Sequence, residues 1–227
     1  MASAALKGEE APEEDDRLPP SGRLAFVNAI QPEFARDFLL PCLCDDVDAL
    51  LALVHTCASL RDLVAGQLTR LDCSKASYLN QFSDGIMLGR NLCFLGANLL
   101  ELDVSQNTFS PDDKLTDAGV GEIAVRCPNL RRFAARDCRL VRTSIKTLAY
   151  RCPGLQEVDL SFYLRHDGAS HGITNDSLAA LARRCRNLTV LKIGRATSVT
   201  DAGLEAIGAH CKNCLLYTSD AADEGLG

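Results

Sequence analysis

Apolar side chains recur along this chain at helical spacing. Four segments carry them at positions i, i+3, i+4 and i+7, which share one face of a helix. The third position is always Ala or Gly, and the fourth is always Cys. The sets are Val120/Ile123/Ala124/Cys127, Ile145/Leu148/Ala149/Cys152, Leu178/Leu181/Ala182/Cys185 and Leu204/Ile207/Gly208/Cys211. We predict four amphipathic helices, each with a small residue for close packing and a Cys that acts as a small buried hydrophobe.

A second apolar pattern, L-x-x-L-x-L, begins three residues after the first three of these Cys and also occurs earlier in the chain. Its last two apolar positions alternate with polar ones, which predicts a short strand. The five copies are Leu68/Leu71/Cys73, Leu99/Leu102/Val104, Leu130/Phe133/Ala135, Leu155/Val158/Leu160 and Leu188/Leu191/Ile193. The basic period is about 25 or 26 residues, with insertions at Gln106–Lys114 and Phe162–Gly172.

Helix-capping residues stand between each predicted strand and the helix that follows it. Thr116-Asp117, Thr174-Asn175 and Thr200-Asp201 directly precede a helical face and supply N-cap residues. The remaining repeat lacks such a pair, and we expect Thr143 or Ser144 to substitute there.

The combined pattern, C-x-x-L-x-x-L-x-L followed by I-T-D-x-x-L-x-x-L-A-x-x-C, resembles the cysteine-containing leucine-rich repeat over residues 68–213. The resemblance implies an α/β leucine-rich-repeat solenoid, with a curved parallel sheet on the concave side and outer helices on the convex side. We assign residues 67–213 to about five repeats of an incomplete array. One repeat cannot bury both of its apolar faces, so the repeats should fold only when stacked.

The first 66 residues do not fit the repeat. Residues 1–22 are rich in Ala, Glu, Asp, Pro and Gly, which is typical of a disordered acidic arm. Apolar residues within 23–66 predict a small helical segment. Because the first repeat has an open apolar end, we expect this segment to cap it.

The segment 23–66 also resembles the F-box. The matching residues are Pro32, Leu39, Leu40 and Leu43 for the motif's opening Pro and first helix, and Asp48, Leu51, Val54, Cys57, Leu60, Arg61 and Leu63 for its second half. The chain departs from the motif because Pro41 falls inside the first helix and the Trp after the Cys is absent. An F-box followed by leucine-rich repeats is a common architecture of substrate receptors in cullin ubiquitin ligases.

The F-box resemblance implies contact with a Skp-type linker subunit of a cullin ligase. On that interpretation Leu39, Leu40 and Leu43 face outward toward the linker, while Val54, Leu60 and Leu63 face the first repeat. The alternative is a plain helical cap, in which all six side chains are buried.

Residues 214–227 are interpreted as a non-native tail. The segment Cys214–Glu224 is similar to a translated sequencing-library adapter, and position 214 holds Cys where the next strand should begin with Leu. We expect the natural sequence to stop near Asn213 and residues 214–227 to lack stable contacts. The repeat Leu188–Asn213 should then expose an apolar edge.

Charge is concentrated at the two ends of the chain. The net charge is −6, with −4 in residues 1–20 and −3 in residues 214–227, which leaves +1 for residues 21–213. A near-neutral body gives no reason to expect nucleic acid or a membrane as partner. The chain has eleven Cys and no visible secretory signal, so we expect free thiols in a reducing compartment, cytoplasmic or nuclear.

No catalytic motif and no metal or cofactor site is recognisable in the sequence. Cys211 and Cys214 have C-x-x-C spacing, but Cys211 belongs to the repeat's apolar face. His166 and His171 flank Asp167 without further ligands at zinc spacing, which favours a solvated loop. We expect a protein that is not an enzyme.

The candidate site is the concave face of the predicted sheet, because side chains between the buried strand positions point there. The candidate partner-binding residues are Asp103, Ser105, Arg132, Arg136, Glu157, Asp159 and Lys192. Their charge alternates by repeat, which suits a protein partner better than a polyanion. We expect a non-catalytic protein-binding adaptor: the substrate-recognition subunit of an SCF-type ubiquitin ligase, or a general scaffold without ligase linkage.

Overall fold

The computed structural model describes five main segments of the chain and some single positions. The segments are 58–74, 96–105, 117–138, 142–162 and 172–218; the single positions are 33, 35, 37, 40, 49, 50, 53, 54, 115 and 140. The chain divides into two units, Met1–Gln31 and Pro32–Gly227, and all described residues belong to the second. The predicted acidic arm, the insertion Gln106–Lys114, and His166 and His171 lie outside the described residues.

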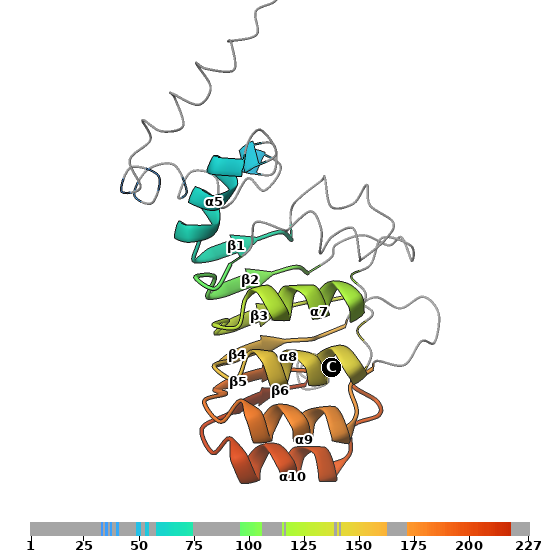
Figure 1. The fold of residues 1–227 in the computed structure, drawn as a ribbon. Helices are drawn as coiled ribbons and strands as arrows, with labels where there is room; N and C mark the ends of the chain where they lie inside the picture. Colours follow the sequence, from blue (N-terminus) through green and yellow to red (C-terminus); the bar gives the residue numbers. More distant parts are fainter. Residues whose placement is uncertain are drawn as a thin grey trace, which may run out of the picture. The chain divides into compact units, whose positions relative to one another are not determined.

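Six three-residue strands form one parallel sheet in chain order (Figure 1). They are β1 (Arg70–Asp72), β2 (Glu101–Asp103), β3 (Arg132–Ala134), β4 (Glu157–Asp159), β5 (Val190–Lys192) and β6 (Leu215–Tyr217). The middle residue of each strand pairs with the middle residue of the next. The five predicted strand positions are therefore confirmed.

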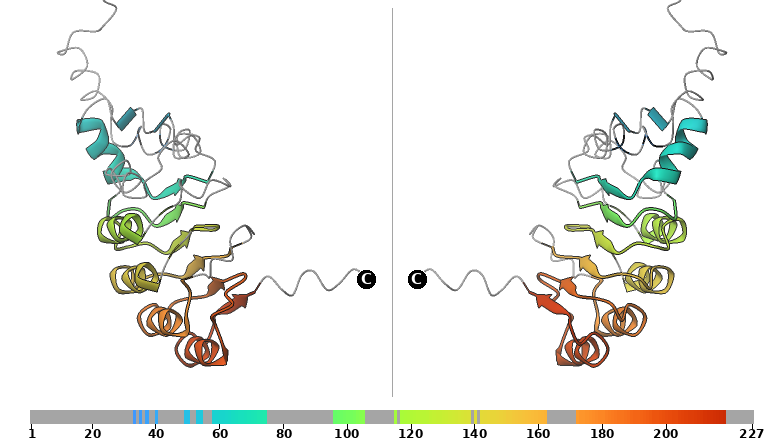
Figure 2. Two further views of the ribbon diagram at one scale, coloured as in Figure 1. Left: turned by 90° about the vertical axis from the view of Figure 1, so that its right-hand side faces the viewer. Right: turned by 90° about the vertical axis from the view of Figure 1, so that its left-hand side faces the viewer.

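The helices with described bounds are α5 (Ala58–Gln67), α7 (Asp117–Arg126), α8 (Arg142–Arg151), α9 (Asn175–Arg184) and α10 (Asp201–His210). Helices α7 to α10 lie side by side along one face of the sheet (Figure 2), and each contacts the next. The described part of the chain is thus an α/β fold with a parallel six-stranded sheet, consistent with a solenoid-like stack of strand–helix units. None of the described helices has the length and apolar character required to cross a bilayer.

The core lies between the helices and the sheet and is built from the predicted apolar positions. In α7, α8 and α9 the four residues of each set are at most 1 % exposed. In α10, Ile207 and Cys211 are buried, whereas Leu204 is 37 % exposed and Gly208 is also exposed. Among the described helices α10 is the last of the stack, and it contacts α9 on one side.

The Cys residues of successive repeats form a ladder of buried thiols. The Sγ of Cys152 donates to the carbonyl of Cys127 at 3.3 Å, that of Cys185 to Cys152 at 3.5 Å, and that of Cys211 to Cys185 at 3.4 Å. Cys152 and Cys185 are free thiols with no exposed surface. The prediction that they are buried core residues is confirmed.

The helix caps agree with the sequence in part. Thr174 is the N-cap of α9 and forms a capping box with Ser177, and Thr200 is the N-cap of α10. The expectation for α8 was wrong: this helix starts at Arg142, so Thr143 lies inside its first turn. The Thr143 hydroxyl instead donates to Asp117 Oδ2 of α7 at 3.2 Å and links neighbouring repeats.

The segment before β1 covers the first repeat. Leu40, Leu50, Val54 and Val64 are buried in the same core cluster as the residues of β1. The Leu40 side chain is 5 % exposed, as the plain-cap alternative expects and unlike the outward position that the F-box alternative gives it. Val54 and Leu60 are buried as predicted and Leu63 is half-buried, while Leu39 and Leu43 lie outside the described residues.

The expectation that residues 214–227 lack stable contacts was wrong for Leu215–Tyr217. These residues form β6, which pairs with β5, and Leu216 is partly buried against the core. An edge strand presents unpaired N–H and C=O groups, so an adjacent segment with β propensity can add to it. Leu191 lies six residues after Cys185, but its partner Leu216 lies only five after Cys211, so the repeat register shortens by one residue there.

Candidate functional site

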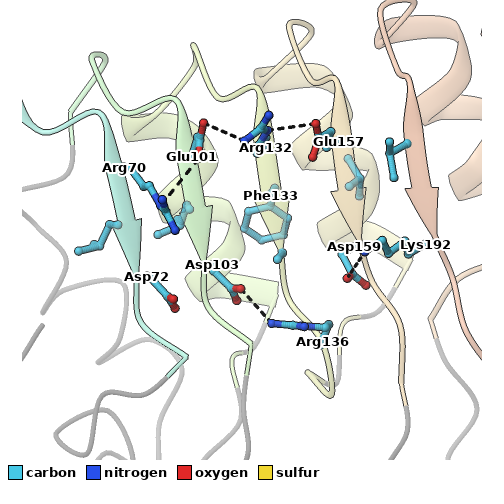
Figure 3. A pocket seen from close by; sticks show the side chains of 15 residues that line it. Arg70, Asp72, Glu101, Asp103, Arg132, Phe133, Arg136, Glu157, Asp159 and Lys192 are labelled. Carbon is cyan, nitrogen blue, oxygen red and sulfur yellow. Dashed lines mark hydrogen bonds and ion pairs between the residues drawn. The ribbon is translucent and has the colours of Figure 1, made fainter. Parts of the chain in front are cut away.

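The face of the sheet opposite to the helices carries two rows of side chains across the strands (Figure 3). In β1 to β5 a buried middle residue lies between two half-buried or exposed residues, so the first and third residues face this open side. The first row is Arg70, Glu101, Arg132, Glu157 and Val190. The second row is Asp72, Asp103, Ala134, Asp159 and Lys192. Together these residues line a hollow on the open face of the sheet.

The first row is a chain of ion pairs with alternating sign. Arg132 donates from Nη1 to Glu101 at 3.2 Å, and its Nε lies 3.1 Å from Glu157. Arg70 lies 3.9 Å from the other oxygen of Glu101. The Arg132 side chain is 53 % exposed, so these pairs sit at the solvent boundary and contribute little to the stability of the fold.

The second row is tied more closely to the backbone. Asp103 accepts the N–H of Ser105 at 2.8 Å, and Asp159 accepts the N–H of Ser161 at 3.1 Å. Asp72 does the same with Ser74 at 2.9 Å. The carboxylates therefore fix the turn after each strand as well as offering charge to a ligand.

Two cationic side chains form ion pairs with aspartates of the second row. Arg136 follows β3 and donates to Asp103 at 3.1 Å and to the Ser105 hydroxyl at 3.0 Å. Lys192 of β5 lies 3.8 Å from Asp159. The side chain of Asp159 is only 16 % exposed, which makes it the least accessible of the charged groups in these ion pairs.

Most of the sequence-predicted residues gather on this face. Asp103, Arg132, Arg136, Glu157, Asp159 and Lys192 all line the hollow. Ser105 does not belong with them at the surface: it is 4 % exposed, and its hydroxyl accepts the backbone N–H of Arg136 at 3.0 Å. Ser105 thus joins two repeats instead of facing a partner.

The sequence reasoning missed three residues of the face, Arg70, Asp72 and Glu101. Glu101 is the most connected of them, because two arginines approach it. The signal was present: Glu101 stands two residues after Leu99, as Arg132 does after Leu130.

The open face is dominated by charged side chains that pair with one another. Its charged groups are Asp, Glu, Arg and Lys side chains in mutual ion pairs, and the described residues hold no group of three His, Cys, Asp or Glu placed to bind a metal ion. Partly exposed ion pairs can exchange one partner for another at low cost, which suits recognition of a charged protein surface.

Comparison with known proteins finds a partial similarity to a curated protein. No family model matches the chain. A segment of 78 residues is 35 % identical to the F-box protein SKIP1 of Arabidopsis thaliana. The match covers 34 % of this chain and 24 % of that protein, so it spans about a quarter of the relative's length. The similarity is therefore to part of an F-box protein.

Proposed function

We propose that this protein is a non-catalytic adaptor that binds another protein through the open face of a leucine-rich-repeat array. The observation that carries the proposal is the charged face, on which β1 to β5 present ion-paired side chains in two registered rows. The five copies of L-x-x-L-x-L and the buried Cys ladder support the assignment of the repeats to the cysteine-containing class.

The adaptor would serve as a substrate-recognition subunit of an SCF-type ubiquitin ligase. The partial similarity to an F-box protein and the F-box-like residues of 32–63 support this role. A Skp-type linker subunit would then bind the N-terminal helices while the open face binds the substrate. The free, buried thiols fit a reducing compartment, cytoplasmic or nuclear.

A scaffold without ligase linkage is the second candidate, and the burial of Leu40 favours it. In an F-box the leucines of the first helix must be available to the linker subunit. Here at least one of them closes the end of the repeat stack instead.

One capture experiment tests both parts of the proposal. The full chain is immobilised under reducing conditions and offered purified linker subunit and then cell extract. Arg132→Glu should abolish retention of a partner at the open face, since it places a third anion between Glu101 and Glu157. Arg151→Glu is the matched control, because Arg151 is exposed at the end of α8. A partner retained or lost equally by both variants would contradict the assignment of the face.

Binding of the Skp-type linker subunit is tested with leucine substitutions. Leu43→Asp should abolish linker binding without change in melting temperature if the F-box interpretation is right. Leu40→Asp should destabilise the fold by about 2–5 kcal/mol, because it buries an unpaired charge. If the unmutated chain fails to bind the linker where a genuine F-box protein does, the ligase role is excluded and the scaffold remains.

A further inference from the structure

In the first row of the open face, cationic and anionic side chains alternate from β1 to β4, and the alternation ends at β5. Glu101 has an arginine on each side, Arg70 on β1 and Arg132 on β3. Glu157 has Arg132 on one side, but its neighbour on the other side, in register on β5, is Val190. The position that would hold the next cation of the row is therefore occupied by a partly exposed apolar side chain.

The geometry points to a binding site for an arginine side chain of a protein partner, at Glu157 and over Val190. This inference rests on the proposed function, because it names the chemistry that the open face would recognise. The incoming guanidinium would take, beside Glu157, the place that Arg70 on the adjacent strand has beside Glu101. Its aliphatic stem would lie on Val190, which an arginine side chain can cover while its charged end stays on the carboxylate.

The charge and exposure of the surrounding groups fit this occupant. The Glu157 side chain is 41 % exposed, so an incoming cation can reach it. Lys192, the nearest cation on β5, lies 3.8 Å from Asp159 in the second row and does not compensate Glu157. A planar guanidinium can form two parallel hydrogen bonds with a carboxylate, which an ammonium group cannot do. The two residues of the site lie on β4 and β5, and Val190 is in register with Leu215 of β6.

The test uses a minimal probe and does not require the partner to be known. N-acetyl-arginine amide is titrated into the full chain, and the methyl signals of Val190 are followed by NMR. N-acetyl-citrulline amide, which has a similar shape without the charge, is the control probe. We expect the arginine probe to shift the Val190 methyl signals by at least about fivefold more than the citrulline probe, because a charge-assisted hydrogen bond is the stronger one.

Matched variants locate the binding group. Glu157→Gln should remove the response to the arginine probe. Glu101→Gln makes the same change at a carboxylate that already has an arginine on each side, and it should retain the response. Val190→Arg should also remove the response, because it completes the row from within the chain. Absence of a shift, an equal shift with citrulline, or a response that survives Glu157→Gln would overturn the site. None of these results depends on linker binding, so failure of the site and failure of the ligase proposal are distinguishable.

Discussion

At the scale of single residues, the buried thiols are the most regular feature of the chain. Cys152, Cys185 and Cys211 each donate to a carbonyl of the preceding repeat and have almost no exposed surface. Burial disfavours the thiolate, which raises the pKa of Cys152 and of Cys185 from an ordinary value near 9 to about 12. The thiols are therefore neutral hydrogen-bond donors at physiological pH and are protected from alkylation in the folded protein.

These pKa shifts predict how stability depends on pH. The unfolded thiols lose their protons as pH rises past about 9, whereas the folded ones keep them until about 12. The free energy of unfolding should therefore be unaffected by these groups below about pH 9 and should fall between about 9 and 12. Urea denaturation at a series of pH values measures this slope.

The contribution of one thiol can be isolated by substitution. Cys152→Ala should make the slope shallower, because it removes one group that titrates differently in the two states. Ile145→Val, which costs a comparable roughly 0.5–1.5 kcal/mol without changing a titrating group, should leave the slope as in the unmutated chain. Equal slopes for Cys152→Ala and the unmutated protein would refute the linkage.

Burial was predictable at the residue scale, and the direction of polar side chains was less so. The Cys positions follow from an apolar period that repeats four times. Ser105 has the same polar character as an exposed residue, and only the approach of Arg136 from the next repeat shows that its hydroxyl is internal. Such contacts join residues 31 apart, which local patterns do not reveal.

At the scale of the elements, asparagine side chains join the segments that precede neighbouring strands. The amide of Asn98 donates to the Gly66 carbonyl at 2.7 Å, and that of Asn129 donates to Ala97 at 2.9 Å. The next repeat has Gly154 at the equivalent position, two residues after its Cys. The series of side-chain bridges is interrupted there.

Restoring the bridge should stabilise the stack. The backbone of Gly154 is not left-handed, and an added Cβ would meet only the Leu130 carbonyl oxygen at 3.8 Å. Gly154→Asn should therefore raise stability by about 1 kcal/mol, from reduced freedom of the unfolded chain and a new hydrogen bond. Thermal unfolding should show a melting temperature higher by about 2–4 °C. Gly154→Ala, which lacks the amide, should give only part of this gain, and an equal gain would exclude the bridge.

The helices and strands themselves could be read from the sequence where the period is intact. The pattern identified β1 to β5 and the buried faces of α7 to α9, because each set of apolar positions recurs at the same distance from a Cys. It failed at the start of α8, where Thr143 bonds to α7 instead of capping its own helix. It failed again at β6, because a one-residue change of register hides Leu216 from a fixed-period search.

At the scale of the whole molecule, the stability of the stack depends on how its last repeat is covered. Deleting residues 214–227 should lower the free energy of unfolding by about 1–2 kcal/mol, because it removes the pairing of β6 and uncovers apolar surface of β5. The melting temperature should fall by a few degrees, at about 2–4 °C per kcal/mol. Light scattering should show increased association through the exposed edge strand.

A chain ending at Thr218 is the control, because it keeps β6. If deletion of 214–227 leaves the melting temperature unchanged, β6 does not form in solution and the original expectation of a tail without contacts is restored. Sequence patterns could not decide this point, because adding a strand to a free edge depends on backbone hydrogen bonds that almost any extended segment can make.

The stacking order has a mechanical consequence. Strands pair with the next strand in the chain, and α7 to α10 contact one another in the same order. When tension is applied to the two ends, the outermost repeat can detach while the inner ones stay folded. Each detachment would release about 25 residues, or roughly 80–90 Å of extended chain. The molecule would then lengthen in steps under load. A partner bound across several strands would raise the force at which the first repeat detaches.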